Sequence, residues 1–295
     1  MTHEFFIVGP TSVGKSELAA DVARKLGAEI VGADAFQIYR GLDLLTAKPD
    51  QATRATAAHH LIGAVPLSEE MNAEKYRAAA EEIIRNIQAR EKPVIVVGGS
   101  GLYVKTLTHG LATLPAANRR LREVLEQATL HELFRSLLAL DPVATRQIDC
   151  QNKRRLIRAV EVCLLTGKPF SAQRMEWREP FVAAAVTGGS AGDAATPNPL
   201  PPVTAGATTG VLIYRDRAEL YARINRRVEQ MFEAGVVEEV RGLEKVSATA
   251  EKTLGLAEIR SLIAGEISQA ECIAKIQQGT RRYAKRQLTW FQRQT

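Results

Sequence analysis

Short apolar runs alternate with amphipathic stretches through the first third of the chain. Residues 5–8, 29–34 and 93–97 form nearly continuous apolar runs, and a helical spacing of apolar residues follows between them, most clearly over residues 73–90. Strands that are buried on both faces have such continuous runs, whereas half-solvated strands alternate. The pattern therefore predicts an α/β fold with a parallel sheet covered by helices on both faces.

The pattern changes at residue 114. From there to about residue 167 only helical spacing appears, so we predict an all-helical insertion in the sheet domain. Residues 183–210 are rich in Gly, Ala, Thr and Pro, with Asp193 as the one charge, and are typical of a flexible linker. A strand at 211–214 and helices over 216–234, 236–245, 258–264 and 269–291 complete the pattern. The predicted divisions are 1–113 (core), 114–180 (helical insertion), 181–210 (linker) and 211–295 (core completion).

A phosphate-binding loop follows the first apolar run. Its sequence satisfies G-x-x-x-x-G-K-[ST] between a predicted strand and a predicted helix. The backbone N–H groups of such a loop point inward, and the helix that follows adds its positive N-terminal end. We expect Lys15 to reach phosphoryl oxygens and the Ser16 hydroxyl to hold Mg²⁺. The predicted fold is therefore P-loop NTPase-like, with a diphosphate-binding set of Gly9, Pro10, Thr11, Ser12, Val13, Gly14, Lys15 and Ser16.

Polar residues also follow the next predicted strands. Asp34 ends the second strand, and Ser100 comes after the glycine pair that ends the third. The carboxyl ends of parallel strands share one edge of the sheet, so these residues should meet the phosphate loop in one crevice. A carboxylate there can bind the water shell of Mg²⁺ or take a proton from a nucleophile. Arg223, on the helix predicted over 216–234, is a candidate ligand for an anion.

The basic residues form two clusters. The chain has 39 Lys and Arg against 33 Asp and Glu, a net charge of +6. Residues 153–158 are basic at four positions, and residues 276–295 carry five basic side chains and no acidic one. A solvated helix face is the usual explanation of one such run. Two clusters in addition to a phosphate site favour the backbone of a nucleic acid as partner.

Composition excludes several other classes of protein. Cys150, Cys163 and Cys272 are far apart and lack the spacing of a metal site or a disulfide framework. The adjacent His59 and His60 would point to opposite faces of an extended segment, which disfavours a metal site. The first six residues lack the basic start and the apolar length that a signal peptide needs, and no run approaches the ~20 apolar residues of a membrane helix. We expect a soluble cytoplasmic protein without a membrane partner.

Together these motifs resemble the tRNA dimethylallyltransferases, also called tRNA isopentenyltransferases. The similar stretches occur in the family's order and cover nearly the whole chain except the linker. The segments at 46–49 (Thr-Ala-Lys-Pro) and 284–290 (Ala-Lys-Arg-Gln-Leu-Thr-Trp) are far more specific than a phosphate loop. The other matching segments are 9–16, 34–43, 59–62, 97–103, 158–162 and 220–224.

The resemblance implies transfer of the dimethylallyl group from dimethylallyl diphosphate to N6 of the adenosine 3′ of the anticodon (position 37), with release of diphosphate. It implies Asp34 as general base, Arg223 and Lys15 as ligands of the diphosphate, and Ser100 in place of the family's usual threonine near the reaction centre. The partner is the anticodon stem-loop of tRNA, and we expect a monomer. The residues expected to contact tRNA are Asp34, Ala35, Phe36, Gln37, Ser100, Arg154, Arg155, Arg158, Arg282, Lys285, Arg286 and Trp290.

Three positions depart from the family pattern, and three other functions stay open. Ala35 replaces a serine, Leu45 a glycine and Leu256 a tyrosine. An adenylate isopentenyltransferase acting on free AMP, ADP or ATP would not need the two basic clusters. A P-loop small-molecule kinase would leave the segment at 46–49 unexplained, and a non-catalytic RNA-binding module would not need Lys15, Ser16 and Asp34 together.

Overall fold

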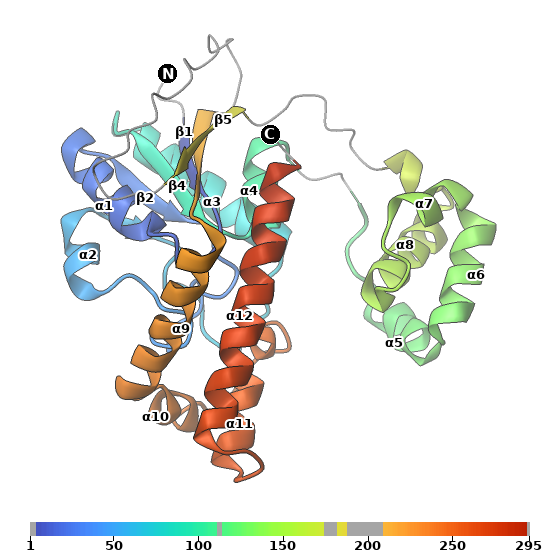
Figure 1. Ribbon diagram of the computed structural model, residues 1–295. Coiled ribbons are helices and arrows are strands. Elements are labelled where there is room, and N and C mark those ends of the chain that lie inside the picture. The colour runs from blue at the N-terminus through green and yellow to red at the C-terminus, as the bar shows by residue number, and fades with distance from the viewer. Residues whose placement is uncertain (1–3, 111–113, 174–181, 188–208, 294–295) are drawn as a thin grey trace. The chain divides into compact units, whose positions relative to one another are not determined.

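One parallel sheet organises the larger part of the protein (Figure 1). The computed structural model describes residues 4–110, 114–173, 182–187 and 209–293. Within them six strands pair in the order β3-β2-β4-β1-β6-β5, every pair parallel. The predicted parallel α/β fold is thus confirmed. The strands are β1 (Glu4–Val8), β2 (Glu29–Gly32), β3 (His59–His60), β4 (Val94–Gly98), β5 (Val182–Thr187) and β6 (Thr209–Tyr214).

The sheet is buried on both faces, as its continuous apolar strands predict. Ile7 of β1 and Ile95 of β4 belong to one buried cluster, which also contains alanines of α1 (Lys15–Leu26). Their neighbours Phe6 and Val96 belong to a second cluster with α3 (Ala73–Gln88) and α4 (Gly101–Thr108). Alternate residues of each strand therefore face opposite layers of helices. A short helix, α2 (Gln51–Thr56), precedes β3.

The helices after β6 extend the core beyond the carboxyl edge of the sheet (Figure 1). They are α9 (Arg217–Glu233), α10 (Val236–Arg241), α11 (Leu256–Ile263) and α12 (Gln269–Gln292). A single 3₁₀ turn, η2 (Ala250–Lys252), precedes α11. Helix α12 begins with a capping box between Ser268 and Glu271 and lies along α9 and α11. None of the described helices is long and apolar enough to cross a membrane.

A separate helical unit spans residues 110–178, and residues 1–109 with 179–295 form the other unit. The helical unit contains α5 (Arg119–Gln127), α6 (Leu130–Leu140), α7 (Pro142–Gln147), α8 (Lys153–Thr166) and the 3₁₀ turn η1 (Ser171–Gln173). Leu133, Leu137 and Leu156 are fully buried in its own core. No strand occurs in residues 114–173, the described part of the segment for which the sequence predicts helices.

The predicted linker at 181–210 needs a correction. Residues Val182–Thr187 form β5, which pairs with β6 along its whole length at one edge of the sheet. Three of its six residues are β-branched and favour a strand, whereas the three alanines at 183–185 do not, and pairing with β6 completes the strand. Residues 188–208 of the predicted linker lie outside the described residues.

A close backbone approach fixes the loop after β4 against the loop after β2. A Cβ atom on Gly98 would lie 2.1 Å from the carbonyl oxygen of Ala33, which only glycine avoids. The amide of Ser100 donates to that same Ala33 oxygen at 3.2 Å. The two strand ends are thereby held in contact beside the residues predicted to do chemistry.

Candidate active site

The phosphate loop joins β1 to α1 as its sequence predicts. Lys15 Nζ turns back over the loop and donates to the carbonyl oxygen of Pro10 at 2.6 Å. Of the predicted set, Thr11, Ser12, Gly14, Lys15 and Ser16 line a polar cavity of about 560 Å³. Val13 is buried beneath the loop and packs in the core with α1. The loop therefore offers both a lysine and a serine hydroxyl to an anion in this cavity.

Asp34 and Ser100 lie together at the neighbouring strand ends. Asp34 Oδ1 accepts from the backbone N–H of Phe36 at 2.9 Å and of Gln37 at 3.2 Å. Ser100 Oγ accepts from the N–H of Ala35 at 2.9 Å. Since Ser100 is an acceptor in this bond, its hydroxyl proton can be donated elsewhere. Asp34 thus lines the same cavity as the phosphate loop, as predicted, whereas Ser100 bonds the backbone beside Asp34 and is not among the residues that line this cavity.

Two cavities meet at three residues. The polar cavity contains the phosphate loop, and a second cavity of about 70 Å³ is lined mainly by apolar side chains of α9, of α12, of the segment just before α11 and of the loop after β2. Thr11, Asp34 and Arg227 line both. A ligand could therefore place an anionic end in the polar cavity and an apolar end in the second cavity. The point where the two ends join would then lie beside Asp34. The apolar residues of the second cavity include Phe36, Leu45, Ile224, Val228, Met231, Leu254 and Ile276.

Arg223 and Arg227 approach the phosphate loop from α9. Arg223 Nε donates to the carbonyl oxygen of Ser12 at 2.9 Å, and the side chain lines the polar cavity as predicted. Arg227 lies one turn further and donates to Thr11 Oγ1 at 3.0 Å and to Ser12 Oγ at 3.2 Å. Its second nitrogen donates to the carbonyl oxygen of Thr46 at 3.3 Å. The two arginines thus add positive charge beside the phosphate loop.

Burial changes the acid–base behaviour of the two cations. Loss of solvation lowers the pKa of Lys15 to about 8, against the opposing attraction of the Asp34 carboxylate. Loss of solvation also lowers the pKa of Arg227 to about 10. The negative charge around these two groups is too small to offset the cost of burying their positive charges. An anion that binds between them would supply it and would raise both pKa values.

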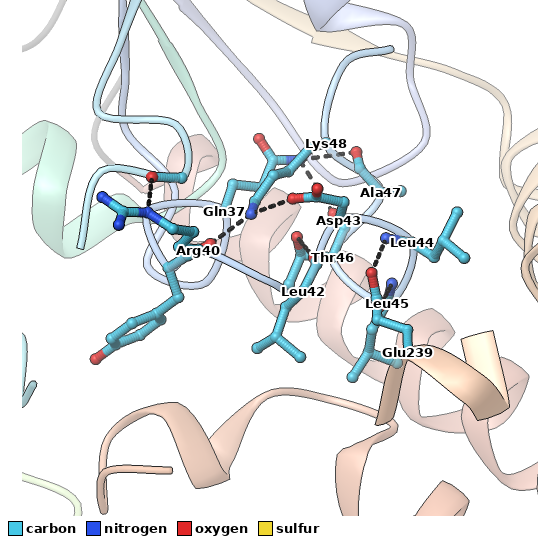
Figure 2. A network of polar contacts seen from close by, with 12 residues as sticks. Gln37, Arg40, Leu42, Asp43, Leu44, Leu45, Thr46, Ala47, Lys48 and Glu239 are labelled. Atoms are coloured by element: carbon cyan, nitrogen blue, oxygen red, sulfur yellow. Dashed lines mark hydrogen bonds and ion pairs between the residues drawn. The ribbon is translucent and has the colours of Figure 1, made fainter. Parts of the chain in front are cut away.

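The loop that follows Asp34 is fixed by an internal network (Figure 2). Gln37 Nε2 donates to the carbonyl oxygens of Thr46 at 3.1 Å and of Ala47 at 3.0 Å. These bonds use both amide protons, so Gln37 can only accept through its Oε1 atom. The predicted contact of Gln37 with an adenine edge is therefore restricted to accepting from an N–H donor of the base.

The same loop is held against α10 and closed by a lysine (Figure 2). The N–H groups of Leu44 and Leu45 donate to the two carboxylate oxygens of Glu239 at 2.8 and 2.9 Å. Lys48 Nζ bonds Asp43 Oδ1 at 2.5 Å and also the carbonyl oxygen of Tyr39. Leu45, one of the departures from the family pattern, packs against Gly255 at the start of α11. The loop is a rigid wall of both cavities.

The predicted tRNA-binding residues of α12 divide into exposed and packed groups. Arg282, Lys285 and Arg286 are exposed on one side of the helix. Trp290 is half-buried and packs on Gly101 of α4 so closely that a Cβ there would lie 2.4 Å from the indole. The basic face is therefore free for a partner, and Trp290 joins α12 to α4.

The basic cluster of the helical unit divides in the same way. Arg154 and Arg155 are exposed on α8, whereas Arg158 contacts Glu161, whose side chain is 0% exposed, at 2.7 Å. Glu161 also accepts two hydrogen bonds from Arg122. Burial opposes ionisation of Glu161, but the hydrogen bonds from Arg122 and Arg158 outweigh it and hold the pKa of the carboxyl below its usual value. Arg158 is thus an internal ion-pair partner.

Sequence reasoning missed two residues of this site. Arg227 is four residues after Arg223, so helical spacing alone places both on one face of α9 and could have found it. Gln287 is a polar residue on the face of α12 that carries Ala284 and Phe291, a pattern break that marks a buried polar group. Gln287 accepts from the N–H of Thr11 in the phosphate loop.

The residues fit a magnesium–diphosphate complex better than a free metal. The described residues contain no group of three or more His, Cys, Asp or Glu side chains that could hold an ion alone. Mg²⁺ commonly takes one or two protein oxygens and completes its shell with water and substrate phosphates. The Ser16 hydroxyl and the Asp34 carboxylate both line the polar cavity and are oxygen donors of this kind.

Comparisons with known proteins agree with this geometry. The family model described as IPP transferase matches residues 37–294. The chain belongs to the IPP transferase family. A tRNA dimethylallyltransferase of Akkermansia muciniphila is 39% identical over 98% of this chain and 90% of its own length, and one of Caulobacter sp. (strain K31) is 40% identical over 100% and 91%. This IPP transferase also resembles the solved full-length tRNA isopentenylpyrophosphate transferase of Bacillus halodurans, with a TM-score of 0.64, 30% identity and coverage of 99% and 87%.

The ion pair of Arg158 gives a prediction about stability. Arg158→Ala leaves a buried carboxylate with one partner fewer, so it should lower the free energy of unfolding by ~2 kcal/mol. Arg154→Ala and Arg155→Ala, exposed residues of the same helix, should change it by less than about 0.5 kcal/mol. Urea unfolding followed by circular dichroism measures all three. Equal midpoints for the three variants would contradict the structural role of Arg158.

The lowered pKa of Lys15 gives a prediction about pH. Only protonated Lys15 attracts a diphosphate, and its protonated fraction falls about tenfold between pH 7 and pH 9 for a pKa near 8. The Kd of an alkyl diphosphate should therefore rise by up to about tenfold over this range. Calorimetric titration measures it. Lys15→Arg keeps its charge and should bind with a Kd that does not change with pH; a flat profile for the unaltered protein contradicts the prediction.

Proposed function

We propose that this IPP transferase moves the dimethylallyl group of dimethylallyl diphosphate to N6 of adenosine 37 in tRNA, on the 3′ side of the anticodon, and releases diphosphate. One observation carries the proposal: a phosphate-binding cavity and an apolar cavity share the Asp34 carboxylate. The substrate has matching parts, an anionic diphosphate and an apolar five-carbon chain. The reactive carbon lies where these parts join.

The phosphate loop and α9 would bind the diphosphate. Lys15, Arg223 and Arg227 supply positive charge from two sides of the polar cavity. Negative charge on the diphosphate grows as its bond to the allylic carbon breaks, so these fixed donors stabilise the transition state more than the ground state. The five-carbon chain would extend from the diphosphate toward the apolar cavity.

Asp34 would accept the proton of the attacking amine. The nitrogen N6 forms a bond to the allylic carbon, the bond from that carbon to the diphosphate oxygen breaks with its electron pair, and one N6 proton is lost. The N–H groups of Phe36 and Gln37 fix Oδ1 of Asp34, which leaves Oδ2 as the acceptor for that proton. Gln37 Oε1 can accept from the second N6 proton, since its own amide protons are bonded within the loop.

The same cavity suits a metal-bound diphosphate. Ser16 would hold Mg²⁺ together with diphosphate oxygens, and the ion would neutralise charge on the leaving group. This chain's residues orient the complex through Lys15 and the arginines of α9. The exposed Arg282, Lys285 and Arg286 of α12 offer a basic surface for the phosphate backbone of the anticodon stem-loop. Unpaired RNA bases such as adenosine 37 are accessible to chemistry once they leave the stack.

The experiment that tests the proposal compares two acceptors. The purified protein is incubated with Mg²⁺, dimethylallyl diphosphate and either unmodified tRNA or AMP, and the nucleosides are identified by mass. Prenylated adenosine from tRNA alone supports the proposal. Product from AMP alone would assign the protein to adenylate prenylation. An absence of product with both acceptors would contradict prenyl transfer.

The role of Asp34 gives a specific prediction. In Asp34→Asn the amide oxygen can still accept from Phe36 and Gln37, so the loop keeps its shape, but the base is lost. The single-turnover rate with tRNA should fall by about 10²–10⁴-fold. The Kd of dimethylallyl diphosphate should stay equal or decrease, because a negative charge leaves the phosphate site. Turnover close to that of the unaltered protein would remove Asp34 as the base.

A further inference from the structure

Helix α12 buries one polar side chain on its apolar face. Gln287 is 6% exposed and lies between Ala284 and Phe291, which are also buried. Burial of an amide without hydrogen-bond partners costs several kcal/mol of stability. The partners of Gln287 therefore indicate why a polar residue stands at this position. The general core packing of α12 does not need a polar residue here.

Gln287 connects the loop that follows β1 to the loop that follows β4 through two hydrogen bonds. Its Oε1 accepts from the backbone N–H of Thr11 at 2.9 Å, and its Nε2 donates to the carbonyl oxygen of Gly99 at 2.8 Å. The fit is tight, because a Cβ on Gly99 would lie 2.3 Å from Nε2. Thr11 belongs to the phosphate loop, and Gly99 precedes Ser100, which bonds the backbone next to Asp34.

We propose that Gln287 is a positioning residue for the prenyl transfer, an inference that rests on the function proposed above. It fixes the phosphate loop, which holds the leaving diphosphate, relative to the turn that supports the base. Thr11 also bonds Arg227 through its side chain, so a shift of Thr11 would move this cation as well. The nucleophile, base and leaving group must be aligned within a fraction of an ångström, and about 1 Å of misplacement can cost 10²-fold in rate.

The chemistry of the side chain makes the idea testable. The two bonds need one acceptor and one donor on neighbouring atoms at the end of the side chain, as an amide or a protonated carboxyl of the same length supplies. Gln287→Glu as a carboxylate keeps the acceptor for Thr11, loses the donor to Gly99 and places a negative charge near the phosphate site. Protonation restores the donor. Gln287→Leu provides neither at any pH.

The experiment compares these variants with Gln277→Leu, which removes another amide of α12. Gln277 donates to α9, to the carbonyl oxygen of Asn225 at 3.3 Å and to Glu229 at 3.1 Å. For Gln287→Leu we expect kcat to fall by about 10²-fold and the KM for tRNA to stay within about threefold. For Gln277→Leu both constants should stay within about threefold of the unaltered protein.

The pH profile separates positioning from general loss of structure. Relative to the unaltered protein, the rate of Gln287→Glu should rise as the pH is lowered from 8 to 6, whereas the relative rate of Gln287→Leu should stay constant. Equal kcat losses in the two leucine variants, or a constant relative rate for Gln287→Glu, would overturn the proposal. Binding of inorganic diphosphate is measured in parallel and should weaken in Gln287→Leu but not in Gln277→Leu.

The two proposals fail in different ways. If the unaltered protein prenylates no acceptor, the proposed function fails, and the diphosphate titration still decides whether Gln287 positions the phosphate loop. If the unaltered protein is active and Gln287→Leu keeps its kcat and its affinity for diphosphate, only the inference about Gln287 fails.

Discussion

The site depends on how closely backbone approaches backbone at the carboxyl edge of the sheet. At Gly98 the chain touches the carbonyl oxygen of Ala33, and at Gly99 it touches the side chain of Gln287. Added methyl groups at these positions would have to displace main chain or a buried amide. Such contact leaves little freedom for the three loops that follow β1, β2 and β4, so their polar groups keep fixed positions. A preorganised site of this kind spends no energy on reorganisation when the ligand reacts.

The sequence predicts much of this arrangement, because parallel sheets obey simple rules. The strands β1, β2, β4 and β6 follow from apolar runs, and the rule that ligands bind beyond the carboxyl ends of strands brings Asp34 and Ser100 to the phosphate loop. Strand β5 was missed because its three alanines and the Gly-, Thr- and Pro-rich residues that follow are typical of a linker, and its pairing with β6 is not visible in the sequence. A local pattern holds no information about that partner.

Other contacts could not be predicted for the same reason, because they depend on residues far apart in the sequence. The bond between Gln287 and Thr11 joins residues 276 positions apart, and nothing near either residue in the sequence announces it. Arg158 looks like its neighbours Arg154 and Arg155, yet only Arg158 faces the buried carboxylate of Glu161. Charge counts predict a basic surface but not which charges are already paired, since that depends on tertiary packing.

The electrostatics of the site indicate the charge of its ligand. Desolvation lowers the pKa values of both Lys15 and Arg227, although the Asp34 carboxylate opposes the shift in each case. The carboxylates of Asp34 and Glu17 therefore do not balance the cations of this cavity, and the unliganded protein holds them at a cost in stability. A diphosphate removes that cost when it binds, so part of its affinity comes from the negative charge that it brings to two desolvated cations. The same excess charge acts on the bond that breaks, because it favours the electron pair moving onto the diphosphate rather than staying with the carbon.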